Sequence, residues 1–175
     1  REKTEVLLRL LHLRKDAGQA AIVFVRAKSA CEQLTSALAG DGLRAASLNG
    51  DVPQAERERI VQRLRDGSID VLVATDVAAR GIDVEGVTHV INYQCPEDEK
   101  TYVHRIGRTG RAGQAGTAVT FVDWDDLHRW TMINKALDLG IPEPVETYSS
   151  SDNLFSDLHI DPSATGRLPK SARTR

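Results

Sequence analysis

The sequence has little cysteine and no long apolar run. Its two cysteines, Cys31 and Cys95, belong to no C-x-x-C pair and to no histidine cluster at metal-ligand spacing. We therefore expect no metal site, and we expect both thiols to pack as small apolar side chains. No stretch reaches the roughly 18 apolar residues of a membrane span, and the first residues lack the apolar core of a signal peptide. These absences predict a soluble, cytoplasmic protein with no membrane partner.

An excess of positive charge is also absent. The net charge is -2 and the pI is near 6.2, so the protein does not coat nucleic acid by bulk charge. Only the tail has a sign bias, because four basic residues follow the last acidic one, Asp161. These are Arg167, Lys170, Arg173 and Arg175. A solvated terminus explains this tail, so any nucleic-acid site must be local.

Two nucleotide-binding motifs are missing. The chain contains no Walker A sequence, and the glycines spaced by threes from Gly107 to Gly116 do not match the dinucleotide fingerprint.

The chain begins at Arg1 rather than at methionine, which favours a piece of a longer protein. With 41% hydrophobic and 27% charged residues, the composition fits one globular domain with a short remainder.

Apolar runs that predict strands alternate with segments whose apolar residues have helical spacing. Strands are expected at 19–26, 43–48, 69–74, 87–93 and 117–122, and helices at 5–15, 28–39, 51–66, 98–111 and 125–139. Asp51 and Pro53 are expected to cap and start the third of these helices. The run 69–74 is the most continuously apolar and is expected in the centre of the sheet. The pattern predicts an α/β fold with a mostly parallel sheet and helices on both faces, in three layers.

The prolines Pro142 and Pro144 break this alternation, and a serine run follows them. We expect one domain over 1–148 and a polar, then basic, extension over 149–175. The apolar residues from Leu154 to Ile160 allow either a docked short helix or a mobile tail. Trp124 and Trp130, at the last predicted helix, are expected to be core or docking residues.

Ligands of parallel sheets bind at the carboxyl ends of the strands, so the loops after strands are the candidate sites. The segment T-D-V-A-A-R-G-I-D follows the most apolar strand and offers a hydroxyl, a fixed charge, a glycine and two carboxylates. These are Thr75, Arg80, Gly81, Asp76 and Asp83. This mixture suits phosphate and sugar contacts, with the carboxylates accepting from hydroxyls or arginine. The alternative is an ordinary surface loop with an internal salt bridge.

The segment H-R-I-G-R-T-G-R is expected to be helical. At about 100° per residue, His104, Arg108 and Arg111 share one face. The face expected against the sheet holds Val103, Ile106, Gly107 and Gly110. Two forked guanidinium groups at this spacing suit the oxygens of a phosphoryl group. A solvated basic face is the alternative.

The segment N-G-D-V-P-Q-A-E-R lies between a strand and a helix. Gly50 permits a tight exit from the strand, and Gln54 and Arg57 share one face of the first helical turn. Such an array can hold a nucleic-acid backbone without reading its sequence. An ordinary helix start is the alternative.

In this order, these motifs closely resemble the second helicase domain of the DEAD-box family of ATP-dependent RNA helicases. The match covers roughly 23–121 and includes VFVRAK, Gln54 with Arg57, ATDVAARGID and YVHRIGRTGR. The spellings ARGID and HRIGRTGR are similar to DEAD-box members rather than to DEAH or RecQ-type enzymes. The resemblance implies a RecA-like, three-layer domain that forms half of a two-lobed enzyme.

The resemblance also implies roles for individual residues. RNA phosphates and riboses would be contacted by Gly50, Gln54, Arg57, Thr75, Arg80 and Gly81. Asp83 would meet the ATP ribose, while Arg108 and Arg111 would reach the γ-phosphate as arginine fingers. His104 would couple this site to the other lobe. Asn49 stands where the family usually has histidine, which weakens any role carried over for its side chain.

By the same resemblance, ATP with Mg²⁺ is bound mainly by an N-terminal helicase lobe that this chain lacks. The expected partners are that lobe and RNA, held without strong sequence preference. The expected function is ATP-driven local unwinding of RNA duplexes by the intact protein, with the isolated fragment inactive. A non-catalytic RNA-binding or scaffold module with the same fold is the alternative.

Overall fold

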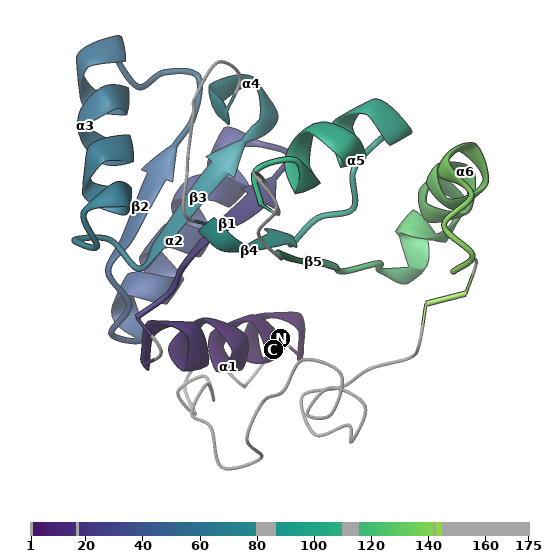
Figure 1. The fold of residues 1–175 in the computed structure, drawn as a ribbon, viewed down its shortest axis with the longest axis horizontal. Helices are drawn as coiled ribbons and strands as arrows, with labels where there is room; N and C mark the ends of the chain where they lie inside the picture. The colour runs from purple at the N-terminus through teal and green to yellow at the C-terminus, as the bar shows by residue number, and fades with distance from the viewer. Residues whose placement is uncertain (1, 17, 80–86, 110–115, 142, 145–175) are drawn as a thin grey trace.

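The computed structural model describes residues 2–16, 18–79, 87–109, 116–141 and 143–144. In these ranges five parallel strands form one sheet in the order β2-β3-β1-β4-β5 (Figure 1). The strands are β1 Ala20–Val25, β2 Ala45–Leu48, β3 Val71–Thr75, β4 Val87–Asn92 and β5 Thr117–Thr120. The helices are α1 Glu2–Asp16, α2 Lys28–Gly40, α3 Gln54–Arg65, α4 Asp76–Ala79, α5 Glu99–Ile106 and α6 Leu127–Leu137, with a 3-10 turn, η1, at Trp124–Asp126. The five predicted strands and the α/β class are confirmed.

The middle strand of the sheet is β1, not the more continuously apolar β3. β1 pairs with β3 on one side and with β4 on the other. β3 is still internal, because β2 pairs with its other edge, and all five of its residues are buried. Burial on both faces makes an apolar run in any internal strand, so the run alone does not identify the middle one.

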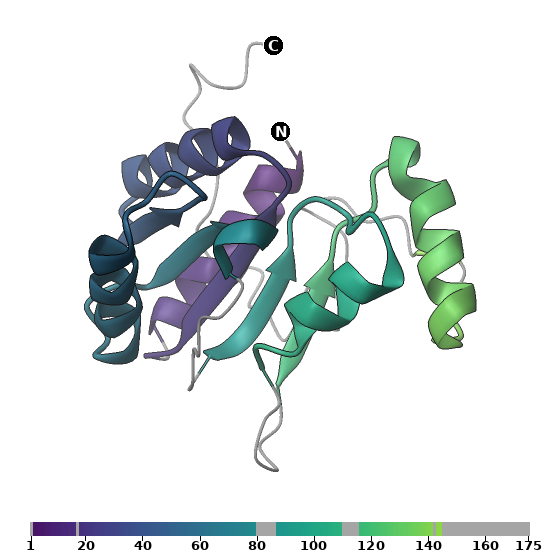
Figure 2. The same cartoon turned by 90° about the horizontal axis from the view of Figure 1, so that it is seen from above.

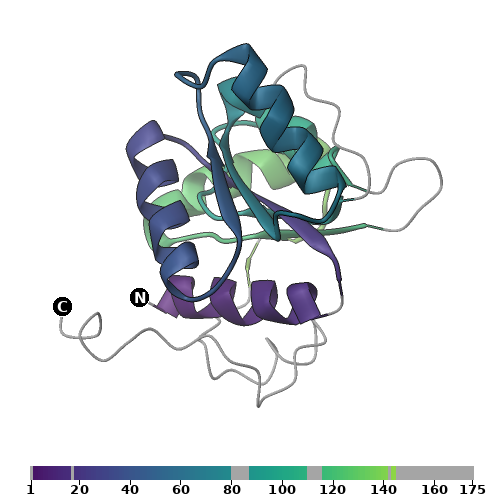
Figure 3. The same cartoon turned by 90° about the vertical axis from the view of Figure 1, so that its left-hand side faces the viewer.

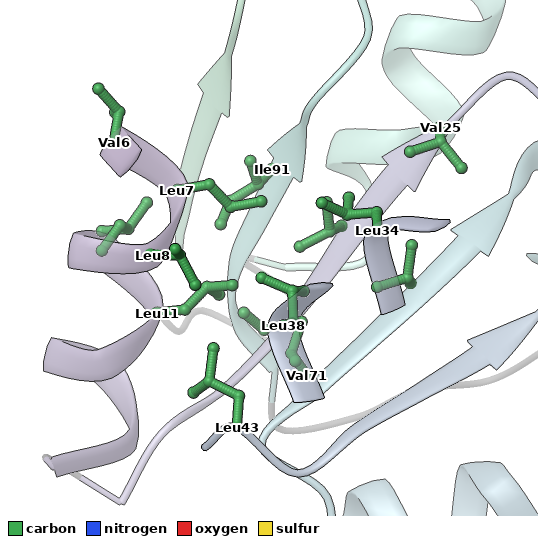
Figure 4. Close-up of a cluster of buried hydrophobic side chains, with 14 of the residues drawn as sticks. Val6, Leu7, Leu8, Leu11, Val25, Leu34, Leu38, Leu43, Val71 and Ile91 are labelled. Atoms are coloured by element: carbon green, nitrogen blue, oxygen red, sulfur yellow. The ribbon is translucent and has the colours of Figure 1, made fainter. Parts of the chain in front are cut away.

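α1 and α2 cover one face of the sheet. Four leucines of α1 are at most 2% exposed, and they pack with alternate residues of the strands. The α1 members are Leu7, Leu8, Leu10 and Leu11. Figure 4 shows several of them beside Leu38 of α2 and Ile91 of β4. The first helix is therefore part of the domain's core.

α3 and α4 cover the opposite face. Ile60, Val61 and Leu64 of α3 are buried against the other set of strand residues, which includes Ile22 and Phe24 of β1. Seen from the β2 side, α1 lies below the strands and α3 above them (Figure 3). The predicted three-layer arrangement is confirmed.

α6 packs on α5 at the far end of the sheet from α3, as both Figure 1 and Figure 2 show. Its Trp130 is 5% exposed, stands edge-on to the ring of Tyr102, and packs in a third apolar cluster with Cys95 and Ile133. Trp130 is a core residue, as expected. Trp124 is 79% exposed and therefore lies outside the core.

Two predicted helix boundaries are wrong. α3 begins at Gln54, and the residue before it, Pro53, is extended with φ -60° and ψ 151°. Asp51 does not cap this helix; its backbone N–H donates to the Asn49 side chain and its carboxylate pairs with Lys28. Proline disfavours helical geometry in the residue before it, which delays the start of the helix.

The second error concerns α5, which ends at Ile106 rather than continuing through residue 111. Its start is as predicted, because Asp98 accepts a hydrogen bond from the backbone of Thr101 at 2.8 Å. Gly107 follows as the C-cap, and the amide of Arg108 bonds to the carbonyl of Arg105 in a tighter turn.

Within the described ranges, no helix is long and apolar enough to cross a membrane, and no three His, Cys, Asp or Glu gather as a metal would require.

Candidate functional site

α4 and α5 meet beyond the carboxyl ends of β1, β3 and β4 through an ion pair between the buried Arg105 and the partly exposed Asp76. The Arg105 side chain is 1% exposed, and its Nε and Nη2 donate to the two carboxylate oxygens of Asp76, each at 2.7 Å. Its Nη1 donates to the carbonyl of Gln94 at 2.8 Å and to Asn92 Oδ1 at 3.4 Å. The guanidinium also lies 5.4 Å from the ring centre of Phe24. A buried guanidinium with four of its five N–H donors bonded in this way is a fixed structural anchor.

This anchor corrects the helical-face prediction for α5. Val103, expected against the sheet, is 45% exposed, and Arg105 is the buried residue of the helix. The prediction failed because the apolar and glycine residues alone were expected to face the sheet. The sequence did contain one signal, since Asp76 was expected to accept from hydroxyls or from an arginine.

A pocket of about 190 Å³ opens beside the ion pair. Its lining comes from β1, α4, α5 and the turn after α5, and consists of Phe24, Asp76, Ala79, Thr101, His104, Arg105 and Arg108. His104 and Arg108, which were predicted to share one face of a helix, both line this pocket. Arg108 is placed by a turn rather than by the helix, and its Nε donates to the His104 carbonyl at 3.3 Å. Arg111 lies outside the described residues.

The third motif approaches the other side of α4. Nη2 of Arg57 donates to the carbonyl of Ala78, and its Nε is buried without a hydrogen-bond partner. A Cβ on Gly50 would lie 4.0 Å from Cγ1 of Val77, so the loop after β2 runs beside α4. Gln54 is exposed on the first turn of α3 and donates to Glu58 at 3.3 Å. Gly50 and Arg57 therefore both lie beside the single turn of α4.

The remaining candidate residues differ in how much of their side chains is exposed. Thr75 is the last residue of β3 and is 7% exposed, so its side chain offers little surface to a ligand. Asn49 is 4% exposed and accepts a hydrogen bond from the Asp51 backbone at 3.0 Å. Its side chain shapes the turn after β2. Arg80, Gly81 and Asp83 lie outside the described residues.

A second network, which the sequence did not reveal, joins the end of β1 to the start of α6 through the buried Asp126. Arg26, after β1, donates through Nε and Nη2 to the Cys95 carbonyl and through Nη2 to Asp126 at 2.7 Å. Arg129 also donates to Asp126, at 2.6 Å. Burial by itself raises the pKa of Asp126, but the hydrogen bonds and charges of the two arginines outweigh it and leave that pKa below its usual value.

Both cysteines are free and buried, as the sequence predicted. Burial, with the charge of Asp126 added to it, raises the pKa of Cys95 to about 11. Burial raises the pKa of Cys31 as well, and its thiol lies 3.1 Å from the Ser47 hydroxyl. A thiol protonated at neutral pH is a poor nucleophile, so these residues serve packing.

Residues 2–113 match the family described as helicase conserved C-terminal domain. The chain belongs to this family. Among curated relatives of this helicase domain, the ATP-dependent RNA helicase DeaD of Mycobacterium tuberculosis is 54% identical over 134 residues, which are 77% of the chain and 23% of DeaD. The ATP-dependent RNA helicase RhlB of Shewanella frigidimarina is 45% identical over 174 residues, 99% of the chain and 39% of RhlB. The chain spans about a quarter of the length of the DeaD relatives it matches.

Solved structures of DEAD-box proteins share the fold of this helicase domain. The Escherichia coli DEAD-box protein SrmB, solved bound to regulator of ribonuclease activity A, has a TM-score of 0.71 at 35% identity, over 86% of this chain and 93% of that one. Saccharomyces cerevisiae Dbp5, solved bound to RNA and ADP BeF3, has a TM-score of 0.75 at 34% identity, over 90% of this chain and 40% of that one. The chain is a RecA-like C-terminal helicase domain of the DEAD-box type.

Proposed function

We propose that this domain is the second lobe of an ATP-dependent RNA helicase that separates short RNA duplexes. One observation carries the proposal: α4 connects a cationic pocket on one side with Arg57 on the other. The family match and the names of the relatives support the assignment. The pocket would face a nucleotide held by an N-terminal lobe, and the Arg57 side would face RNA.

The chemistry of the pocket fits phosphate oxygens better than a metal ion. Asp76 is the carboxylate among its lining residues, and Arg105 engages both of its oxygens. Arg108 supplies a forked cation at the pocket wall, which suits a phosphoryl group. We therefore assign the binding of Mg²⁺ and of most of the ATP molecule to the N-terminal lobe.

Within this division of work, Arg108 and Arg111 act as arginine fingers toward the γ-phosphate. Each stabilises charge that develops on the transferring phosphoryl oxygens, an effect worth about 10³ to 10⁵ in rate. His104, exposed at the same pocket, contacts the N-terminal lobe when the two lobes close. Asp83 holds the ATP ribose.

RNA is held on the other side of α4 by its backbone. Arg57 and Arg80 meet phosphates, Gly50 and Gly81 let the RNA approach closely, and Gln54 and Thr75 complete the surface. The relative Dbp5 has been solved with RNA and a nucleotide analogue together, which supports a shared role for this fold. Backbone contacts carry little sequence information, so binding should show no strong sequence preference.

Single arginine substitutions in the full-length protein test the catalytic assignment. Arg108→Ala and Arg111→Ala should each lower the RNA-stimulated rate of ATP hydrolysis by at least about 10³-fold, because a transition-state cation is lost. Phosphate release is the measurement, and circular dichroism checks that the fold is kept. Lys135→Ala, which removes an exposed charge on α6, is the control and should keep the full rate.

Two outcomes would contradict the proposal in different ways. An Arg111→Ala enzyme that retains more than about a tenth of the wild-type rate excludes the arginine-finger role. A wild-type protein that binds RNA but never hydrolyses ATP supports the other function, a non-catalytic RNA-binding or scaffold module.

A further inference from the structure

α4 is a single helical turn that is held from two directions. On the pocket side, both oxygens of Asp76 accept from Arg105. On the other side, the carbonyl of Ala78 accepts from Arg57. Only one residue separates Asp76 from Ala78, so a displacement of either residue moves the other. A helix of this length has almost no internal hydrogen bonding to hold its position, and its place depends on the anchors.

Of the two anchors, Arg105 is the more rigid. Its third nitrogen, Nη1, is bound to the carbonyl of Gln94, and the Gln94 side chain accepts from the Arg26 backbone at 2.6 Å. The guanidinium therefore ties α4 to the ends of both β4 and β1. Arg57 is held less firmly, because its Nε has no hydrogen-bond partner and its side chain is partly exposed.

We propose that Arg105 is a positioning residue, which holds α4 in place through its ion pair with Asp76. With α4 held in this way, RNA contact at Arg57 sets the geometry of the pocket lined by His104 and Arg108. The inference rests on the function proposed above. The Arg105 side chain is 1% exposed, and four of its five N–H donors are bonded to Asp76, Gln94 and Asn92, so it is poorly placed to bind a phosphate. Its effect on the reaction is carried by the residues around it.

Arg105→Lys in the full-length enzyme tests this role. Lysine keeps the charge but cannot bridge both oxygens of Asp76 and the Gln94 carbonyl with one ammonium group. At saturating RNA, kcat should fall about tenfold to a hundredfold, because a small misplacement of catalytic groups has effects of this size. KM for ATP and Kd for RNA should each change by less than about threefold, because the residues that bind both ligands remain.

Asp76→Asn is the second variant and removes the same ion pair from the other end. The double variant should be no slower than the more impaired single variant, because both substitutions break one interaction. The matched control is Leu38→Ala, which creates a cavity on the opposite face of the sheet, far from α4. It lowers stability without touching the pocket, and its kcat should stay within about twofold of wild type below the melting temperature.

These measurements separate the inference from the proposed function. An active wild type whose Arg105→Lys variant keeps its kcat overturns the positioning role alone. Loss of kcat in Leu38→Ala to the same extent also overturns it, because stability would then explain the effect. A wild type without RNA-stimulated hydrolysis overturns the proposed function, and this inference with it.

Discussion

His89 on β4 is a buried histidine whose ionisation is coupled to folding. It is 7% exposed, and burial, helped by the charge of Arg14, lowers its pKa from 6.5 to about 4. Its Nδ1 lies 2.9 Å from the Thr88 hydroxyl. The folded state thus holds His89 neutral, while the unfolded state binds a proton below about pH 6.5. Its contribution to stability is complete above that pH and is lost as the pH falls toward 4.

We predict that unfolding free energy falls by about 2 kcal/mol from this group between pH 7 and pH 5. Urea unfolding at the two pH values measures the loss. His89→Gln should abolish most of the difference, whereas His128→Gln, at an exposed site on α6, should not. The buried carboxylates Asp70 and Asp126 have lowered pKa values, so their losses come below about pH 4. An equal pH dependence in wild type and His89→Gln would contradict the prediction.

For individual residues, the sequence predicted the side chains that line the pocket better than the side chains that hold neighbouring elements together. His104 and Arg108 were found because their spacing and chemistry match a known pattern, and both line the pocket. Arg105 and Arg26 were missed as anchors, although both stand inside recognised motifs. Their roles come from partners 29 to 100 residues away, Asp76 and Asp126, and local periodicity carries no information about such pairs.

Among the secondary-structure elements, α6 depends on one buried carboxylate for its attachment. Asp126 precedes the helix, is 6% exposed, and accepts from Arg26 and Arg129. Asp126→Asn should lower the unfolding free energy by about 2 kcal/mol, because two partly buried arginines lose their counter-charge. Urea unfolding at pH 7 measures this.

The neighbouring Asp125 provides the matched control, since it is exposed. Asp125→Asn should change stability by less than about 0.5 kcal/mol. Equal effects of the two substitutions would show that the ion pairs add nothing beyond surface charge.

The elements themselves were largely predictable from the sequence. All five strands appear where apolar runs placed them, because strands buried on both faces cannot contain many polar residues. The helix starts and ends were less predictable at Pro53 and Gly107, where turn geometry overrides spacing. α4 was not predicted at all, since four residues are too few to show a period and its stability comes from contacts on both sides.

At the scale of the whole molecule, the order of strands was beyond the sequence. The runs of β1 and β3 are both almost entirely buried, and which one lies in the middle depends on crossovers that leave no local trace. The order nevertheless decides function. It places the exits of β3 and β4 on either side of β1, so that α4 and α5 meet over Phe24 and form the pocket.

The pocket lies on one domain, and in our proposal the nucleotide is held mainly by another. The purified 175-residue chain should therefore show no measurable ATP hydrolysis, but it should bind single-stranded RNA weakly. If Arg57 and Arg80 neutralise about two phosphates, affinity should fall about sevenfold between 50 and 200 mM salt. Fluorescence anisotropy with a labelled oligonucleotide measures this slope. Arg57→Ala should reduce the drop to about threefold, while Lys135→Ala should leave it unchanged. Binding that ignores salt would remove the phosphate contacts from the proposal, and robust hydrolysis by this chain alone would show that it holds a complete catalytic site.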